Sequence, residues 1–254
     1  MKKKYLIIAS IAVIAVTMLA CVFIINKNNK EDLSSADTPA PQESDGGDDA
    51  WTGDLTDEDN RELLDAYKIM KEDNPDFAGY LMVVGTNVAY PVMYSPEDPE
   101  KYLHKDLNGL ESHGGLPFID TRCNIEPDSD NIIIYGHNMK DGSKFSSLID
   151  YQDKAFYEDH KIIRYDTTDE VREYEVMAVF YDKVYYIDED VFKFYDFIDA
   201  GDEYDYEDNV NEYLKRSIYD TGVRAVYGDK LITLVTCSYH TENGRFVVVA
   251  RRKG

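Results

Sequence analysis

The chain has 254 residues and a formal net charge of −23, because 50 Asp and Glu residues outnumber 27 Lys and Arg residues. This length suits one large domain or two small ones with a substantial core, and 43% hydrophobic residues exclude wholesale disorder. The acidic balance excludes nucleic acid as a partner, and three cysteines at positions 21, 123 and 237 fit neither a disulfide framework nor a zinc-binding spacing.

The chain begins with a membrane-targeting pattern. Three lysines in residues 1–4 precede 21 uncharged residues at 5–25, which as a helix would be about 31 Å long, close to the ~30 Å hydrocarbon core of a bilayer. This length favours a retained transmembrane signal anchor over a cleaved signal peptide or a lipoprotein signal ending at Cys21. The positive-inside rule then leaves residues 1–4 in the cytoplasm. We therefore expect a single-pass protein of the cell membrane with its remaining residues on the extracellular face.

An acidic linker is predicted at residues 26–56. The stretch from Glu31 to Asn60 holds eleven carboxylates and no Lys or Arg. Its Ser, Gly, Pro and Asp content is typical of a flexible tether, so a single external domain is expected at residues 57–254.

This domain is predicted to be mainly β. Thr56–Asp59 looks like a capping box for a helix that Asn74-Pro75 ends. Beyond it, eight short apolar runs separated by turn residues predict strands: Gly79–Val84, Val88–Met93, Leu116–Asp120, Asn131–Tyr135, Ile162–Tyr165, Tyr174–Tyr181, Lys230–Thr236 and Arg245–Arg251. Helices confined to the start and to one late insertion favour a mainly antiparallel barrel or sandwich.

The late insertion combines helical spacing with acidic side chains. The residues at helical spacing are Phe194, Phe197, Ile198, Val210, Tyr213, Leu214 and Ile218. Asp188–Asp208 holds ten carboxylates against Lys193. These charges could disfavour acidic ligands or could simply be solvated.

Three residue types suited to acyl transfer stand at predicted strand ends. Cys237 follows an apolar strand, and His137 follows another, after Gly136. A thiol nucleophile needs a base of this kind; His240, three residues from Cys237, is the local competitor, but a mobile loop orients a base poorly. Arg245 opens the last strand, and a hairpin between the last two strands would bring it beside Cys237, where it could stabilise an oxyanion.

These segments resemble the sortases, and class B in particular. The resemblance rests on Thr233-Leu234-Val235-Thr236-Cys237, on Arg245 at the head of a Val-rich strand, on Tyr135-Gly136-His137-Asn138-Met139, and on the long insertion between about Val191 and Tyr219. It covers roughly Asp57 to Gly254. It implies an eight-stranded sortase-type β-barrel with an N-terminal helix and a helical insertion before the cysteine strand.

The resemblance also implies an activity. Cys237 would attack a Thr–Gly or Thr–Asn bond in the C-terminal sorting signal of a secreted protein, and an amine of a peptidoglycan precursor or cross-bridge would resolve the thioester. His137 would act as general acid/base and Arg245 would stabilise the oxyanion. Leu103 and Thr236 match residues that contact substrate. No metal or cofactor is implied, and the partners are the sorted protein, the cell-wall amine and, through residues 5–25, the membrane.

Other classes fit the sequence less well. A papain-like hydrolase would place its cysteine before its histidine, whereas here His137 precedes Cys237. An L,D-transpeptidase would show Ser-His-Gly-Cys, but Ser112-His113-Gly114 is followed by Gly115. A non-catalytic surface adhesin would leave the thiol, imidazole and guanidinium at three strand ends as coincidence.

Overall fold

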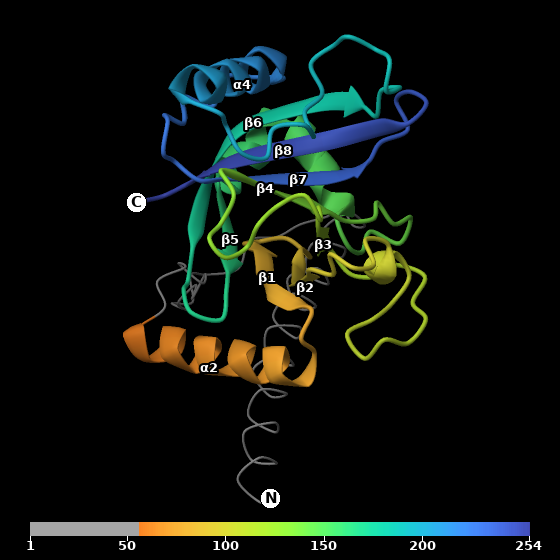
Figure 1. Cartoon of the computed structure of the whole chain (residues 1–254), viewed down its shortest axis with the longest axis vertical. Helices are drawn as coiled ribbons and strands as arrows, with labels where there is room; N and C mark the ends of the chain where they lie inside the picture. The colour runs from red at the N-terminus through yellow and green to blue at the C-terminus, as the bar shows by residue number, and fades with distance from the viewer. Residues whose placement is uncertain (1–55) are drawn as a thin grey trace, which may run out of the picture. The chain divides into compact units, whose positions relative to one another are not determined.

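The computed structural model describes residues 56–254, of which Asn60–Gly254 form one compact unit. Eight strands close into a barrel in the spatial order β1-β2-β3-β4-β7-β8-β6-β5 (Figure 1). The strands are β1 (Phe77–Val83), β2 (Ala89–Met93), β3 (Phe118–Ile119), β4 (Asn131–Tyr135), β5 (Ile162–Asp166), β6 (Glu173–Lys183), β7 (Leu231–Cys237) and β8 (Gly244–Arg252). Each lies within two residues of a predicted strand at both ends, so the eight-stranded, mainly β fold is confirmed.

The domain opens with the predicted helix, α2 (Asp57–Asp73). Its capping box is reciprocal: the Thr56 N–H donates to Asp59 Oδ2 at 3.0 Å, and the Asp59 N–H donates to Thr56 Oγ1 at 3.2 Å. The apolar side of α2 packs on residues of β1, β2 and the β2–β3 connection, in a small cluster built around Tyr67, Phe77 and Met93.

Two strand pairs are parallel within the expected mainly antiparallel pattern: β2 with β3 through a single residue pair and, more important for the site, β4 with β7. β4 pairs with β7 in parallel, with Ile133 opposite Thr233 and Tyr135 opposite Val235. β7 and β6 both pair with β8 in antiparallel fashion. The C-terminal ends of β4 and β7 therefore lie side by side at one end of the barrel, although about a hundred residues separate them in the chain.

The late helix is shorter than the sequence pattern suggests. α4 (Glu203–Arg216) begins at an Asp202 cap, whose Oδ1 accepts the Asp205 N–H at 2.9 Å. Phe194 and Phe197 are buried as expected but lie in non-helical chain before α4, so the helical prediction was wrong for this half. Their rings pack against Tyr206, Tyr213 and Phe180; tertiary packing, and not helix periodicity, explains their spacing.

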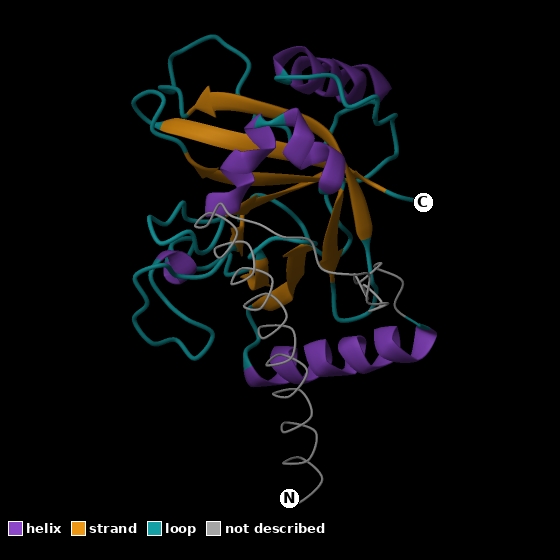
Figure 2. Ribbon diagram, turned by 180° about the vertical axis from the view of Figure 1, so that it is seen from behind, coloured by secondary structure: helices purple, strands orange, loops and turns teal. Residues whose placement is uncertain are grey.

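Short helices also lie outside the predicted places. η1 (Lys101–Leu103) follows β2, and η2 (Ser146–Gln152) and α3 (Lys154–Asp159) follow β4. Figure 2 shows η2 and α3 in purple beside the long strands, and η2 contacts both β6 and β8. The prediction that helices are confined to the start and one late insertion was therefore wrong; these segments are too short for their periodicity to be recognised.

The predicted localisation, a single-pass membrane protein with an extracellular domain, is corrected by the structure. No helix within residues 56–254 is long and apolar enough to cross a membrane. α2 has 17 residues, many of them charged, whereas a span needs about 20 predominantly apolar residues. The anchor predicted at residues 5–25 lies outside the described residues, as does the linker predicted at 26–56 apart from its last residue.

Candidate active site

One face of the sheet ends in a row of four chemically active side chains. Cys237 at the end of β7 pairs with Arg245 on β8, and Arg245 pairs in turn with Asp182 on β6. Residues directly opposite each other on neighbouring strands point to the same face. Continuing the parallel β4–β7 register by two residues beyond Tyr135 and Val235 brings His137 beside Cys237. The strand register therefore pairs Cys237 with Arg245, extends to His137 when continued past β4, and adds Asp182.

The rest of this face is covered by the insertion and α4. Phe180, two residues before Asp182 on β6, packs on the rings of Phe194 and Tyr213. On β4, the Asn131 side-chain amide donates to the Phe197 carbonyl at 2.9 Å. α4 lies beside β6 in Figure 1. The insertion and α4 thus cover this face of the sheet up to the level of Cys237, Arg245 and Asp182.

Cys237 is the accessible cysteine of the two that the structure describes. It is half-buried, whereas Cys123 is 1% exposed. Burial raises the pKa of the Cys123 thiol to about 12, so this thiol remains protonated and unreactive near neutral pH. The Cys237 backbone is fixed by the Asn138 side-chain amide, which donates to its carbonyl at 3.0 Å. The residue after His137 thereby ties the histidine loop to the cysteine.

Gly136 brings the chain out of β4 next to β7. Its N–H donates to the Val235 carbonyl at 3.0 Å, and its carbonyl accepts the Thr236 hydroxyl at 2.8 Å. A Cβ here would lie 2.5 Å from the Phe145 ring, so close packing requires glycine. Thr236 is itself buried, and its hydroxyl joins the two strands; its predicted contact with substrate stays a prediction.

The His137 ring is held at the end of η1, where Leu103 lies. Its Nε2 lies 2.9 Å from the Leu103 carbonyl oxygen, and its ring stacks against that of His104 with centroids 5.7 Å apart. Glycine at position 115 permits this arrangement. Its φ is +49°, and a Cβ on this residue would lie 2.4 Å from the Leu103 carbonyl oxygen. The predicted residue Leu103 therefore acts on His137 through its backbone.

His240, the alternative base, is turned to the other face of the sheet. Its Nδ1 lies 2.9 Å from the Ser238 hydroxyl, and its ring packs on Tyr181 with centroids 4.8 Å apart. Tyr181 pairs with Phe246, and this pair is next to the Asp182–Arg245 pair along the strands. Because successive side chains on a strand alternate between faces, Tyr181 points to the face opposite Cys237. The geometry favours His137 as the partner of the thiol.

Arg245 is held at the turn between β7 and β8. Its Nη1 donates to the carbonyls of Asn243 at 3.2 Å and Gly244 at 2.9 Å. The Asn243 carbonyl also accepts the N–H of Val184, the first residue after β6, at 3.0 Å. The Arg245 guanidinium, the β7–β8 turn and the chain that follows β6 are therefore linked at Asn243.

A second link joins the insertion to the strand of His137. Arg122 Nη2 donates to the Tyr195 carbonyl at 2.6 Å and to Asp120 Oδ2 at 2.8 Å. Asp120 also accepts the Tyr135 hydroxyl at 3.0 Å. Tyr135 ends β4, two residues before His137, so this network fixes the insertion next to the site.

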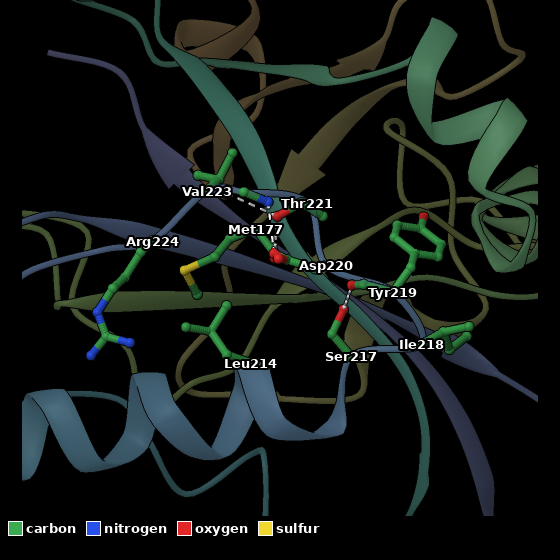
Figure 3. Close-up of a pocket in the computed structure, with 10 residues that line it drawn as sticks. Met177, Leu214, Ser217, Ile218, Tyr219, Asp220, Thr221, Val223 and Arg224 are labelled. Atoms are coloured by element: carbon green, nitrogen blue, oxygen red, sulfur yellow. Dashed lines mark hydrogen bonds between the residues drawn. The ribbon is translucent and has the colours of Figure 1, made fainter.

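A cavity of about 630 Å³ lies at the other end of the insertion, between the end of α4 and β6 (Figure 3). Met177, Leu214 and Val223 form its apolar part, and Arg224 lies at its edge. Met177 precedes Asp182 by five residues on β6, so this cavity is separate from the row of Cys237.

Sequence reasoning missed Asn138 and Asp182. Asn138 was part of the motif that resembles the sortases, but its bond to Cys237 depends on the parallel pairing of β4 with β7. Asp182 was one acid near the end of a predicted strand, and no sequence signal placed it opposite Arg245.

Comparisons with known proteins agree with this geometry. The sortase domain family matches residues 82–253. Sortase B of Listeria monocytogenes is 33% identical over 193 residues, covering 74% of each chain. The Staphylococcus aureus sortase B–substrate complex aligns with TM-score 0.66 and 26% identity, covering 75% of this chain and 85% of that one. A structure of sortase B complexed with triglycine aligns with TM-score 0.67 and 27% identity, covering 75% and 86%. The chain belongs to the sortase family, class B, and is a cysteine transpeptidase.

Proposed function

We propose that Cys237, His137 and Arg245 are the catalytic residues of this transpeptidase, and that residues 57–254 form its catalytic domain. The observation that supports the assignment is the strand register: Cys237 pairs with Arg245, and continuing the β4–β7 register two residues beyond Tyr135 brings His137 beside Cys237. A nucleophile, a proton carrier and a cationic donor so arranged are the components that acyl transfer needs.

The first half of the reaction consumes a peptide bond. The Cys237 thiolate attacks the carbonyl carbon of the Thr–Gly or Thr–Asn bond in a C-terminal sorting signal of the LPxTG or NPxTN kind. The oxyanion of the tetrahedral intermediate is stabilised by the Arg245 guanidinium. The C–N bond then breaks, and His137 as imidazolium gives its proton to the leaving amine. The product is a thioester between Cys237 and the threonine carbonyl.

The second half transfers the acyl group to an amine. Neutral His137 removes a proton from the incoming amino group, which attacks the thioester carbonyl and expels the Cys237 thiolate. A solved sortase B carries a substrate and another carries triglycine, which supports a sorting signal as donor and a glycine-type amine of the cell wall as acceptor. The secreted protein is thereby joined to peptidoglycan or its precursor.

Mass spectrometry of the acyl-enzyme tests this proposal. Incubation with a sorting-signal peptide should add the mass of the acyl fragment to the peptide that contains Cys237. Cys237→Ala should lose the adduct, whereas the matched variant Cys123→Ala, which removes the buried thiol, should keep it.

Product analysis with triglycine then separates transfer from hydrolysis. A product joined to triglycine supports the transpeptidase, and a free threonine carboxylate in saturating triglycine would favour a hydrolytic cysteine peptidase. Failure of every sorting-signal peptide to acylate Cys237 would contradict the proposed donor.

A further inference from the structure

Asp182 lies in the same row as the proposed catalytic residues, and its role is unexplained by them. It pairs with Arg245 across β6 and β8, and Arg245 pairs with Cys237 across β8 and β7. The guanidinium therefore has a carboxylate on one side and the thiol on the other. The proposed acyl transfer uses only the side of the guanidinium that faces Cys237.

The Asp182 carboxylate is buried and half satisfied. Asp182 is 7% exposed, and its Oδ1 accepts the Lys183 N–H at 2.8 Å. Oδ2 is buried without a hydrogen-bond partner within residues 56–254. An unpaired buried oxygen of an anion is costly, and such atoms are rare in folded proteins. Among residues 56–254 no donor meets this oxygen in full hydrogen-bond geometry in the resting arrangement, so the oxygen can accept one.

The cations around Asp182 leave Arg245 as the suitable donor. Lys183 directs its ammonium elsewhere: Nζ lies 4.8 Å from the centre of the Tyr185 ring and 3.8 Å from Glu189 Oε2. The guanidinium of Arg245 has five N–H groups in two edges, and its two hydrogen bonds to residues 56–254 both use Nη1. Nε and Nη2 remain free for a second acceptor.

Tyr185 also lies near Asp182. Burial raises the pKa of Tyr185 to about 12, and hydrogen bonding of its hydroxyl to Asp182 and the charge of that carboxylate add to the effect, so the hydroxyl stays protonated and can donate to Asp182 at neutral pH. Its backbone N–H donates to the Tyr195 hydroxyl at 3.1 Å. Tyr185 is thus the competing partner of Asp182, and a test must separate it from Arg245.

We propose that Asp182 is a positioning residue for Arg245: when the guanidinium leaves the turn carbonyls to meet the oxyanion at Cys237, its rear edge binds the free Oδ2 of Asp182. The carboxylate holds the orientation of the guanidinium and spares the cost of ordering it at the moment of attack. This inference rests on the proposed function, because it acts through Arg245.

A double-mutant cycle tests the pair. Single-turnover acylation of Cys237 by a sorting-signal peptide is measured in wild type, Asp182→Asn, Arg245→Ala and the double variant, with Asp188→Asn as the control for loss of one exposed acid nearby. Asp182→Asn should slow acylation by about 10- to 100-fold, the equivalent of one charge-assisted hydrogen bond. In the Arg245→Ala background the same change should have no further effect. Independent, multiplicative effects would overturn the proposal.

Two further variants separate positioning from packing and from Tyr185. Asn matches Asp in shape, whereas Glu keeps the charge; Asp182→Glu retaining more activity than Asp182→Asn supports the proposal, and the reverse order assigns Asp182 to packing. Tyr185→Phe should acylate at the wild-type rate, and loss equal to that of Asp182→Asn would transfer the role to Tyr185. Failure of both Asp182 variants to fold would likewise overturn it.

The outcomes also distinguish this inference from the proposed function. If wild type forms no thioester at Cys237, the proposed function fails and this inference fails with it. If wild type acylates normally and Asp182→Asn matches its rate, only the role of Asp182 is overturned.

Discussion

Arg245 stands between two neighbours of opposite chemistry, because β8 lies between the strand of Cys237 and the strand of Asp182. Its guanidinium is the one charged group that the register places directly opposite the thiol. It is only half-buried and bonds to two turn carbonyls, so it can move without disturbing the core. Its contribution should appear in catalysis and hardly at all in folding.

We therefore expect Arg245→Ala to lower kcat by about 10²- to 10³-fold, the usual loss for one oxyanion donor, with little change in the unfolding temperature. Steady-state transpeptidation with a sorting-signal peptide and triglycine measures the first, and circular dichroism the second. Arg252→Ala, at the other end of the same strand, is the matched control and should keep wild-type turnover. Near-normal turnover of Arg245→Ala would remove this residue from the catalytic set.

At the scale of elements, α4 and the insertion are fixed to the sheet by aromatic packing. Phe180 is 1% exposed, and its ring centre lies 6.4 Å from that of Phe194 and 5.9 Å from that of Tyr213. Phe180→Ala should lower the free energy of unfolding by about 3–5 kcal/mol through the lost burial and the cavity left behind. Tyr204 on α4 is 81% exposed and serves as the control. Tyr204→Ala should change the free energy of unfolding by less than about 0.5 kcal/mol. Equal effects in chemical denaturation would contradict this packing role.

The link between β3, β4 and the insertion depends on an ionised carboxylate. Burial opposes the ionisation of Asp120, but hydrogen bonds from Arg122 and Tyr135 outweigh it and hold the Asp120 pKa below its usual value. A lowered folded-state pKa stabilises the protein above the unfolded pKa of about 4, and this stabilisation is lost as pH falls through the folded value. Asp120→Asn should therefore be less stable than wild type at neutral pH and lose less stability in acid.

Urea unfolding between pH ~7 and ~2 checks the sign of this dependence. Tyr135→Phe, which removes one of the bonds to Asp120, should show a smaller effect in the same direction. Parallel curves for wild type and Asp120→Asn would contradict the assignment.

At the scale of the whole molecule, the chemistry is confined to one part of the chain. The family match covers residues 82–253, and every residue to which a catalytic or positioning role is assigned lies within it. A chain of residues 57–254 should therefore keep kcat and KM for a sorting-signal peptide within about twofold of the full chain, as expected for an independently folding domain. A large loss of kcat in the shorter chain would assign part of the catalytic machinery to residues 1–56.

Local patterns were enough for the strands and for half of the site. The position of Arg245, eight residues after Cys237, predicted a hairpin, and the two residues pair as expected. The parallel β4–β7 pairing and the contact between Leu103 and His137 could not be predicted, because both join segments distant in sequence. Asp182 was missed for the same reason: its importance lies in its neighbour on β8, not in its own strand.

The pairing of β4 with β7 also has a consequence for the newly made chain. His137 and Cys237 meet only when segments about a hundred residues apart have closed the barrel, and contacts of such long range form slowly. A full-length chain trapped in a partly folded state therefore carries the Cys237 thiol apart from its proton carrier. Acylation competence during refolding should rise together with the last cooperative phase and not with early helix formation. The topology thus delays the appearance of a reactive nucleophile until the barrel has closed.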